Sequence, residues 1–290
     1  MPASAIVLLV VQSVTAGPAA ELAGPRVRES SGIAVSRAHP DVLWTHNDSG
    51  DGPFLYATDL LGRDRGWLRI PGARAVDWED IAIGPCPPPL KGHLFCVYLA
   101  DTGDNVERRP HVALYAVPEP APPTGPGDTL RTTGAPATLR LRYPDGPHDV
   151  EAVYVSTRDS ALYLVSKGRS ASIRLYRVGA EQWAAPDEIA VATAVQTLDI
   201  RPSMEAGRVV TGAGIRPDGR VVALRTYTEI FVFNPGVGGR LVPARERPCG
   251  IAGLDRAGEA IDFVRDSTWV ITSEASGRHP GTIRTVVCHR

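Results

Sequence analysis

The feature that most constrains this sequence is a unit of short apolar strands that recurs five times along the chain. Each unit opens with a polar residue and a small or acidic residue, and continues as an alternating apolar run. The five opening runs are Glu29–Val35, Trp78–Ile83, Val150–Val155, Val210–Ile215 and Gly258–Phe263. Two further apolar runs follow each of them, and several units add a fourth, more polar run. Units of this content predict the four-stranded blades of a β-propeller.

The spacing of the units indicates how many blades the ring contains. The positions taken as equivalent are Ile33, Ile81, Val153, Gly214 and Ile261. They lie 47 to 72 residues apart, whereas a four-stranded blade takes about 40–50 residues. The second and third units therefore contain insertions, one of them the proline-rich stretch 118–126. We predict five blades, with six as the alternative if residues 180–207 contain another unit.

The two ends of the chain predict how the ring closes. The fifth unit ends after only three strands, and Leu22–Arg28 is a strand-sized segment without a unit of its own. We expect this N-terminal segment to complete the last blade of a single, all-β propeller domain. A β-sandwich is the runner-up architecture, since it also has short strands and frequent turns. It does not predict an acidic residue at the same place in several units.

Composition agrees with this fold and excludes some classes of partner. The chain has 29 Gly and 26 Pro among 290 residues, which is incompatible with long helices, while 43% hydrophobic residues suffice for a core. The formal net charge is −1, so there is no global attraction to nucleic acid. We expect a monomer that does not bind nucleic acid.

The N-terminus has the pattern of a secretory signal peptide. Ala5–Val11 is an apolar run, and Val14 and Ala16 occupy the −3 and −1 positions of a cleavage site. Cleavage after residue 16, or as late as 20, would leave a propeller domain over residues 21–290. No Lys or Arg precedes the run, so an uncleaved anchor or a truncated start is the alternative. The run is shorter than the ~20 residues of a membrane span, and we expect a secreted or periplasmic protein.

The four cysteines favour an oxidising compartment. Cys86 and Cys96 flank a turn-rich connector between two strand-like runs, and Cys249 and Cys288, although distant in sequence, are both expected in the last unit. We predict two disulfides with these pairings, and buried free thiols are the alternative. A zinc site is disfavoured because the sequence has no Cys-x-x-Cys spacing.

Propeller topology predicts one polar face. The start of each innermost strand lies on the same face as the loop that joins the second and third strands. Acidic strand starts and polar loops would therefore meet around the channel, where bound cations or basic side chains would offset their repulsion. The candidate ligand-binding residues are Asn47, Asp48, Glu79, Asp80, Asp101, Asp104, Asn105, Glu151, Lys167, Arg225 and Glu259.

Oxygen-rich clusters of this type suit a hard cation such as Ca²⁺, which takes six to eight oxygen ligands. The loops lack the twelve-residue EF-hand pattern, so several blades would have to supply the ligands. The predicted metal ligands are Glu79, Glu151, Asn47, Asp101 and Asp104. In the empty protein their charges would repel, so Glu151→Gln is expected to raise its stability. The alternative for the loop residues is ordinary turn formation by Asn, Asp and Gly.

Signatures of catalysis are weaker. The sequence contains no Gly-x-Ser-x-Gly elbow, no His-Glu-x-x-His and no glycine-rich phosphate loop. If the protein is an enzyme, the candidate catalytic residues are Glu151, Asp101 and His46.

Four motifs carry a resemblance to a family of secreted bacterial β-propeller proteins with no settled function. They lie in Asp77–Ala82, Ala100–Arg109, Tyr143–Ala152 and Val210–Tyr227. At the level of a propeller with an acidic channel, the chain also resembles phytase-like, esterase-like and lactonase-type propellers. That resemblance implies Ca²⁺ at the top of the channel. A true phytase has a cluster of basic residues that binds phosphate, and here Lys167, Arg169 and Arg225 are the only candidates for it.

Two classes of function follow. The first is a recognition or scaffold module that presents its acidic, Ca²⁺-binding face to a small molecule, glycan or peptide. The alternative is a Ca²⁺-dependent hydrolase acting on a phosphate or carboxylate ester, with Glu151 or Asp101 as general base. Fold alone does not choose between them.

Overall fold

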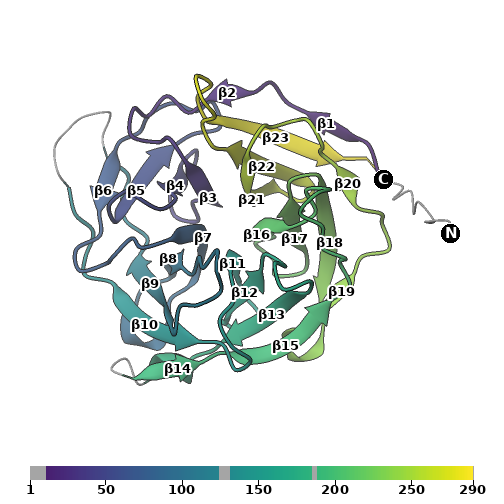
Figure 1. Ribbon diagram of the computed structural model, residues 1–290. Coiled ribbons are helices and arrows are strands. Elements are labelled where there is room, and N and C mark those ends of the chain that lie inside the picture. The colour runs from purple at the N-terminus through teal and green to yellow at the C-terminus, as the bar shows by residue number, and fades with distance from the viewer. Residues whose placement is uncertain (1–10, 124–130, 185–187, 290) are drawn as a thin grey trace, which may run out of the picture.

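Five antiparallel sheets surround a central channel in the computed structural model, which describes residues 11–123, 131–184 and 188–289 (Figure 1). The first blade comprises β3 (Ser30–Val35), β4 (Leu43–Asn47), β5 (Phe54–Thr58) and β6 (Trp67–Arg69). The second comprises β7 (Trp78–Pro85), β8 (Phe95–Asp101), β9 (Val112–Pro118) and β10 (Ala137–Arg142), with β14 (Ile189–Val191) added in parallel to β10. The third comprises β11 (Val150–Val155), β12 (Leu162–Ser166), β13 (Ile173–Val178) and β15 (Thr193–Leu198).

The last two blades complete the ring. The fourth contains β16 (Val210–Ile215), β17 (Val222–Thr226), β18 (Glu229–Pro235) and β19 (Leu241–Pro243), and β20 (Cys249–Gly250) also pairs with β18. The fifth contains β21 (Gly258–Arg265), β22 (Thr268–Ser273) and β23 (Thr282–Cys288). The N-terminal strands β1 (Val14–Ala16) and β2 (Ala20–Glu21) pair with β23. The predicted five-bladed, all-β propeller closed by an N-terminal strand is therefore confirmed.

The closing strand lies upstream of the segment predicted for it. Residues 22–28 contain Gly24 and Pro25, which interrupt a strand, and the pairing with β23 is made before them by β1 and β2. The predicted signal-peptide run lies largely in residues 1–10, outside the described residues. Cleavage after Ala16 remains a prediction. It would remove β1 and leave β2 to close the blade.

The six-blade alternative is excluded by the use of residues 180–207. Within this stretch, β14 joins the outer edge of the second blade and β15 forms the outer strand of the third. The register also corrects one equivalence, because Ala213 pairs with Leu224 as Ile33 pairs with Thr45. Ala213, and not Gly214, is thus the counterpart of Ile33. The sequence pattern missed this because Gly212 and Gly214 flank Ala213 and blur the alternation.

The core consists of apolar layers between neighbouring blades. One layer contains Val153 and Leu164 of the third blade together with Leu114 and Leu139 of the second. The short helical segments among the described residues are the 3₁₀ turns Pro88–Leu90, Gln182–Ala184 and Val237–Gly239. No described helix has the length and apolar character needed to cross a membrane.

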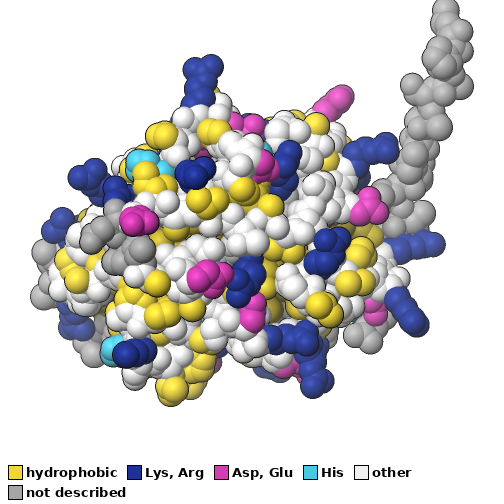
Figure 2. Space-filling view, turned by 90° about the horizontal axis from the view of Figure 1, so that it is seen from below, with side chains coloured by type: hydrophobic (Ala, Val, Ile, Leu, Met, Phe, Trp, Pro, Cys, Tyr) yellow, Lys and Arg dark blue, Asp and Glu magenta, His cyan; other side chains and the backbone are white. Residues whose placement is uncertain are grey.

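Both predicted disulfides are present. Cys86, which directly follows β7, is bonded to Cys96 in β8, and their Cα atoms are 4.9 Å apart. Cys249–Cys288 links β20 to β23 across the last two blades. Cys249 was expected in the last unit but lies in the fourth blade, because β20 pairs with β18, so the second bond ties the C-terminal strand to the blade that precedes it. Seen from the side, the surface carries basic and acidic side chains interspersed (Figure 2), which agrees with the near-zero net charge.

Candidate metal centre at the channel mouth

A shift in β-register marks the start of every inner strand. It falls between Ser30 and Gly32, Trp78 and Asp80, Val150 and Ala152, Val210 and Gly212, and Gly258 and Ile261. A bulge of this kind leaves a residue out of the ladder and changes the direction of its side chain. The residues at the equivalent bulge position are Ser31, Glu79, Glu151, Thr211 and Glu259.

The two hydroxyl residues of this ring connect neighbouring blades. Ser31 Oγ donates to the Glu79 carbonyl at 2.8 Å, and Thr211 Oγ1 donates to the Glu259 carbonyl at 2.9 Å. The backbone at the two glutamates is thereby fixed from the preceding blade. The other three positions of the ring carry carboxylates. The sequence prediction of an acid at the same place in three units thus has a structural cause, the repeated bulge.

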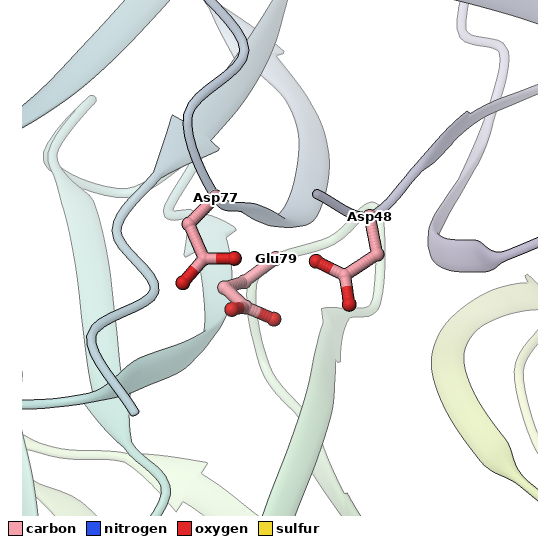
Figure 3. Close-up of side chains that lie close together, drawn as sticks. All are labelled: Asp48, Asp77 and Glu79. Atoms are coloured by element: carbon pink, nitrogen blue, oxygen red, sulfur yellow. The ribbon is translucent and has the colours of Figure 1, made fainter. Parts of the chain in front are cut away.

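Glu79 lies at the centre of the acidic cluster. Its side chain and those of Asp48 and Asp77 offer oxygens that all lie within 4.8 Å of one another, and the three carboxylates converge in Figure 3. Glu79 also forms a second group of this kind with Asp149 and Glu151. Although Glu79 is only 5% exposed, its carboxylate has no hydrogen bond or ion pair with any residue that the structure describes.

The loop after β8 is shaped to admit the Glu79 side chain. A Cβ added at Gly103 would lie 2.0 Å from Glu79 Oε1 and 2.5 Å from Asp77 Oδ2. Real Cβ atoms do not approach other atoms so closely, so any side chain here would displace the carboxylates. The Asp77 backbone is held by an N–H bond to Asp101 Oδ1 at 3.1 Å. A glycine at this position is therefore a requirement of the site.

The second carboxylate group is neutralised by basic side chains. Lys167 Nζ donates to Glu151 Oε1 at 2.6 Å, and Arg169 pairs with the buried carboxylate of Asp149. Asp149 Oδ1 also accepts the backbone N–H of Asp104 at 2.9 Å. The cluster therefore has a compensated half and, around Asp48, Asp77 and Glu79, an uncompensated half.

Burial raises the pKa of Glu79, Glu151, Asp77, Glu259 and Glu274 at the mouth, and neighbouring carboxylates raise it further. Burial followed by the charge of Glu151 raises the pKa of Glu79 well above its ordinary value. Burial raises the pKa of Glu151 to about 8 although Lys167 opposes the shift. The remaining raised pKa values, again with burial as the main cause, are about 6 for Asp77, about 7 for Glu259 and about 8 for Glu274. Such groups favour protons or a bound cation over remaining charged and empty.

Three of the predicted metal ligands have other partners. Asn47 Oδ1 accepts the backbone N–H groups of Arg28 and Glu29 at 2.9 and 3.0 Å. Asp101 is paired with Arg109 Nη2 at 2.9 Å, and Asp104 accepts the Arg109 N–H at 2.6 Å. These residues hold the loops of the mouth in shape, and of the predicted metal set only Glu79 and Glu151 lie in the carboxylate groups.

Asp77 and Asp149 were not predicted as metal ligands. They occupy equivalent places, since Asp77-Trp-Glu79 and Asp149-Val-Glu151 both read Asp-x-Glu across the bulge. That repeated triplet is the signal that could have identified them. Asp48, which the sequence suggested as a ligand-binding residue, lies in the uncompensated half.

Several candidate residues have structural partners instead. Asp80 is buried and accepts the N–H groups of Val153 at 2.8 Å and Ala213 at 3.3 Å, which connects three blades through the channel. Arg225 is buried, pairs with Asp255 at 2.8 Å and donates to two carbonyls.

The remaining candidates, Asn105, Glu259 and His46, also have contacts of their own. Asn105 contacts Arg169, and Glu259 accepts from the Tyr227 hydroxyl at 3.3 Å. His46 is buried, its Nδ1 lies 2.8 Å from the Asn47 carbonyl, and its ring meets the Trp78 ring edge-on. Burial lowers the pKa of His46. His46 thus packs against Trp78, and its buried Nε2 has no hydrogen-bond partner among the described residues.

Fold and site together define a five-bladed propeller with a buried acidic cluster at one mouth of its channel. No family model matches the sequence, and no curated protein matches it. Among solved structures, the chain is similar to the PQQ-bound aldose sugar dehydrogenase of Streptomyces coelicolor, with 12% identity and a TM-score of 0.51 over 94% of this chain and 98% of that one. At this identity the likeness shows the fold alone.

A second solved structure is the hydrazine synthase of Kuenenia stuttgartiensis. It has 12% identity and a TM-score of 0.43, and the match covers 91% of this chain and 64% of that one. This likeness is too low to support an argument about the site.

Proposed function

We propose that this protein is a cation-dependent recognition module that binds Ca²⁺ between Asp48, Asp77 and Glu79. The observation that supports this most strongly is the buried Glu79 carboxylate, which has two carboxylates beside it and no compensating partner among the described residues. A buried carboxyl group without a partner is unfavourable in its charged form unless it takes up a proton or binds a metal. Three carboxylates from two blades match the oxygen preference of Ca²⁺, whose flexible geometry tolerates ligands of this kind.

The exposure of the three ligands suggests how the module would be used. Glu79 is buried, whereas Asp48 and Asp77 are half-buried. The ion would therefore be held from below by Glu79 and keep coordination positions toward solvent. An oxygen-bearing ligand such as a glycan, a peptide carboxylate or a small acid would bind there. Two disulfides support a role in an oxidising compartment, which agrees with export.

The similar sugar dehydrogenase structure contains bound pyrroloquinoline quinone (PQQ), so we asked whether the channel mouth of this protein fits that cofactor. The residues at this mouth do not fit it, because that cofactor carries several carboxylates and the mouth is lined by carboxylates. The nearby basic side chains are engaged, Lys167 with Glu151 and Arg169 with Asp149.

Thermal unfolding with Ca²⁺ and with a chelator tests the proposal. At a hundredfold excess over Kd, a bound ion stabilises the fold by about 2.7 kcal/mol, so the melting temperature of the wild type should rise. Glu79→Gln should abolish the shift. Asp218→Asn, an exposed carboxylate paired with Arg216 away from the mouth, should preserve it. A wild type that melts at the same temperature with Ca²⁺ and with chelator contradicts the proposal.

A hydrolase is the second candidate, and one contact favours it. Glu151 lies 2.6 Å from Lys167, and burial raises its pKa to about 8, close enough to neutral pH for a group that gives or takes a proton in general acid–base catalysis. When bound, the cation would supply Lewis-acid polarisation of an ester oxygen. Turnover of phosphate and carboxylate esters that is lost on chelation and in Glu151→Gln would establish this activity. Absence of turnover by the Ca²⁺-loaded protein would leave the recognition module.

A further inference from the structure

We infer that Lys167 takes the place of a second divalent cation, so that the channel mouth binds one ion and not two. The inference rests on the proposed Ca²⁺ site and defines its stoichiometry. The described residues contain two groups of three carboxylates, each with its oxygens within 4.8 Å, and Glu79 belongs to both. Geometry alone would therefore allow two ions bridged by Glu79.

The two carboxylate groups differ in whether basic side chains are paired with them. The half with Asp48 and Asp77 has no Lys or Arg paired with its carboxylates in the part of the chain that the structure describes. In the other half, Lys167 Nζ lies 2.6 Å from Glu151 Oε1 and Arg169 pairs with Asp149. A cation placed among Glu79, Asp149 and Glu151 would meet the ammonium group. The buried, unpartnered Glu79 carboxylate is directed toward both halves and is left to the ion of the first.

The residue type at position 167 is itself unusual in this chain. Lys91 and Lys167 are the only lysines among 31 Lys and Arg residues. An ammonium group is a compact point charge, whereas guanidinium is planar and forked. A compact cation beside Glu151 can therefore take the place of a metal ion.

The backbone fixes Lys167 in this position. Its N–H donates to the Asp149 carbonyl at 2.8 Å, and its carbonyl accepts the Val210 N–H at 3.1 Å. The residue is 8% exposed. These bonds hold the Lys167 backbone between the third and fourth blades, and its ion pair with Glu151 holds the side chain in the cluster. Lys167 is a built-in part of the site and sets how many ions the site accepts.

Isothermal titration calorimetry of the chelator-treated full chain with Ca²⁺ tests the inference. We expect one ion per chain for the wild type and two for Lys167→Met, which is unbranched and only one heavy atom shorter and removes the charge. Lys167→Gln, which can still donate to Glu151, is a second variant in case the first does not fold, and it should also bind two. Lys91→Met, at an exposed lysine, is the matched control and should bind one.

The outcomes distinguish the inference from the proposal on which it rests. No binding to any variant contradicts the Ca²⁺ site itself. One ion in the wild type and one in a folded Lys167 variant leaves the site intact and overturns the role of Lys167. Two ions in the wild type also overturns it.

Discussion

At the scale of single residues, Gly103 is the position where the channel mouth tolerates least change. Gly103→Ala would place a Cβ 2.0 Å from Glu79 Oε1. We expect this overpacking to cost about 1–3 kcal/mol of stability and to weaken Ca²⁺ binding, measured by urea unfolding and calorimetry. Gly134→Ala is the control, because a Cβ at Gly134 meets no atom within 4 Å. Equal effects of the two substitutions would show that the Gly103 contact is unimportant.

Glu151→Gln is a second informative substitution. The structure predicts that it lowers the stability of the ion-free protein, whereas the sequence predicted an increase. The sequence suggested that removing one carboxylate would relieve repulsion and stabilise the empty protein. Glu151 is instead the partner of Lys167, which is 8% exposed. Its loss would leave a buried ammonium group without a carboxylate, at a cost of about 1–3 kcal/mol. Denaturant unfolding at pH 9 with chelator should show this loss. A gain in stability would mean that the pair contributes little.

Residue identity made part of the site predictable. Glu79, Glu151 and Glu259 could be found because the bulge recurs at the same place in each repeat. Asn47 and Asp101 were grouped with them because both follow strand ends. Sequence could not reveal that Asn47 binds the backbone near Arg28 or that Asp101 binds Arg109, since these partners depend on how loops fold over one another.

At the scale of elements, the two disulfides should differ in their contribution. Cys249–Cys288 closes a loop of 39 residues and Cys86–Cys96 one of 10. The chain-entropy model gives about 4 and about 3 kcal/mol respectively. The double variant lacking the longer bond should therefore be the less stable, and it also frees the last strand. Denaturant midpoints of the two double variants measure the difference, and the opposite ranking would contradict this account.

The sequence predicted the order of the strands correctly, but it did not predict the position of the closing strand or the pairing of β14. Four strands per blade could be predicted because alternating apolar runs recur with turns between them. The N-terminal closure was placed too late, because Leu22–Arg28 has strand-like length but contains Gly24 and Pro25. The parallel pairing of β14 with β10 could not be foreseen, since it joins an insertion in one unit to the sheet of another.

At the scale of the whole molecule, the acidic mouth should make stability depend on pH. The folded pKa values of Glu259 and Glu274 are about 7 and about 8, above the unfolded value near 4.3. Below the unfolded value both states are protonated and no stability is lost. As pH rises toward 8, the unfolded chain ionises first, so folding becomes less favourable. Melting temperatures with chelator should fall from pH 5 to pH 8, and a rise over this range would contradict the prediction.

Ca²⁺ binding at the channel mouth is tested most directly by a crystal structure of the protein with Mn²⁺ or Ca²⁺, in which anomalous scattering locates the ion. We expect one peak per chain at the channel mouth, within roughly 2.0–2.6 Å of oxygens from Asp48, Asp77 and Glu79. We also expect Lys167 to remain paired with Glu151. A map at saturating cation with no peak beside Glu79, or with peaks only on the outer rim of the blades, would contradict the proposed site.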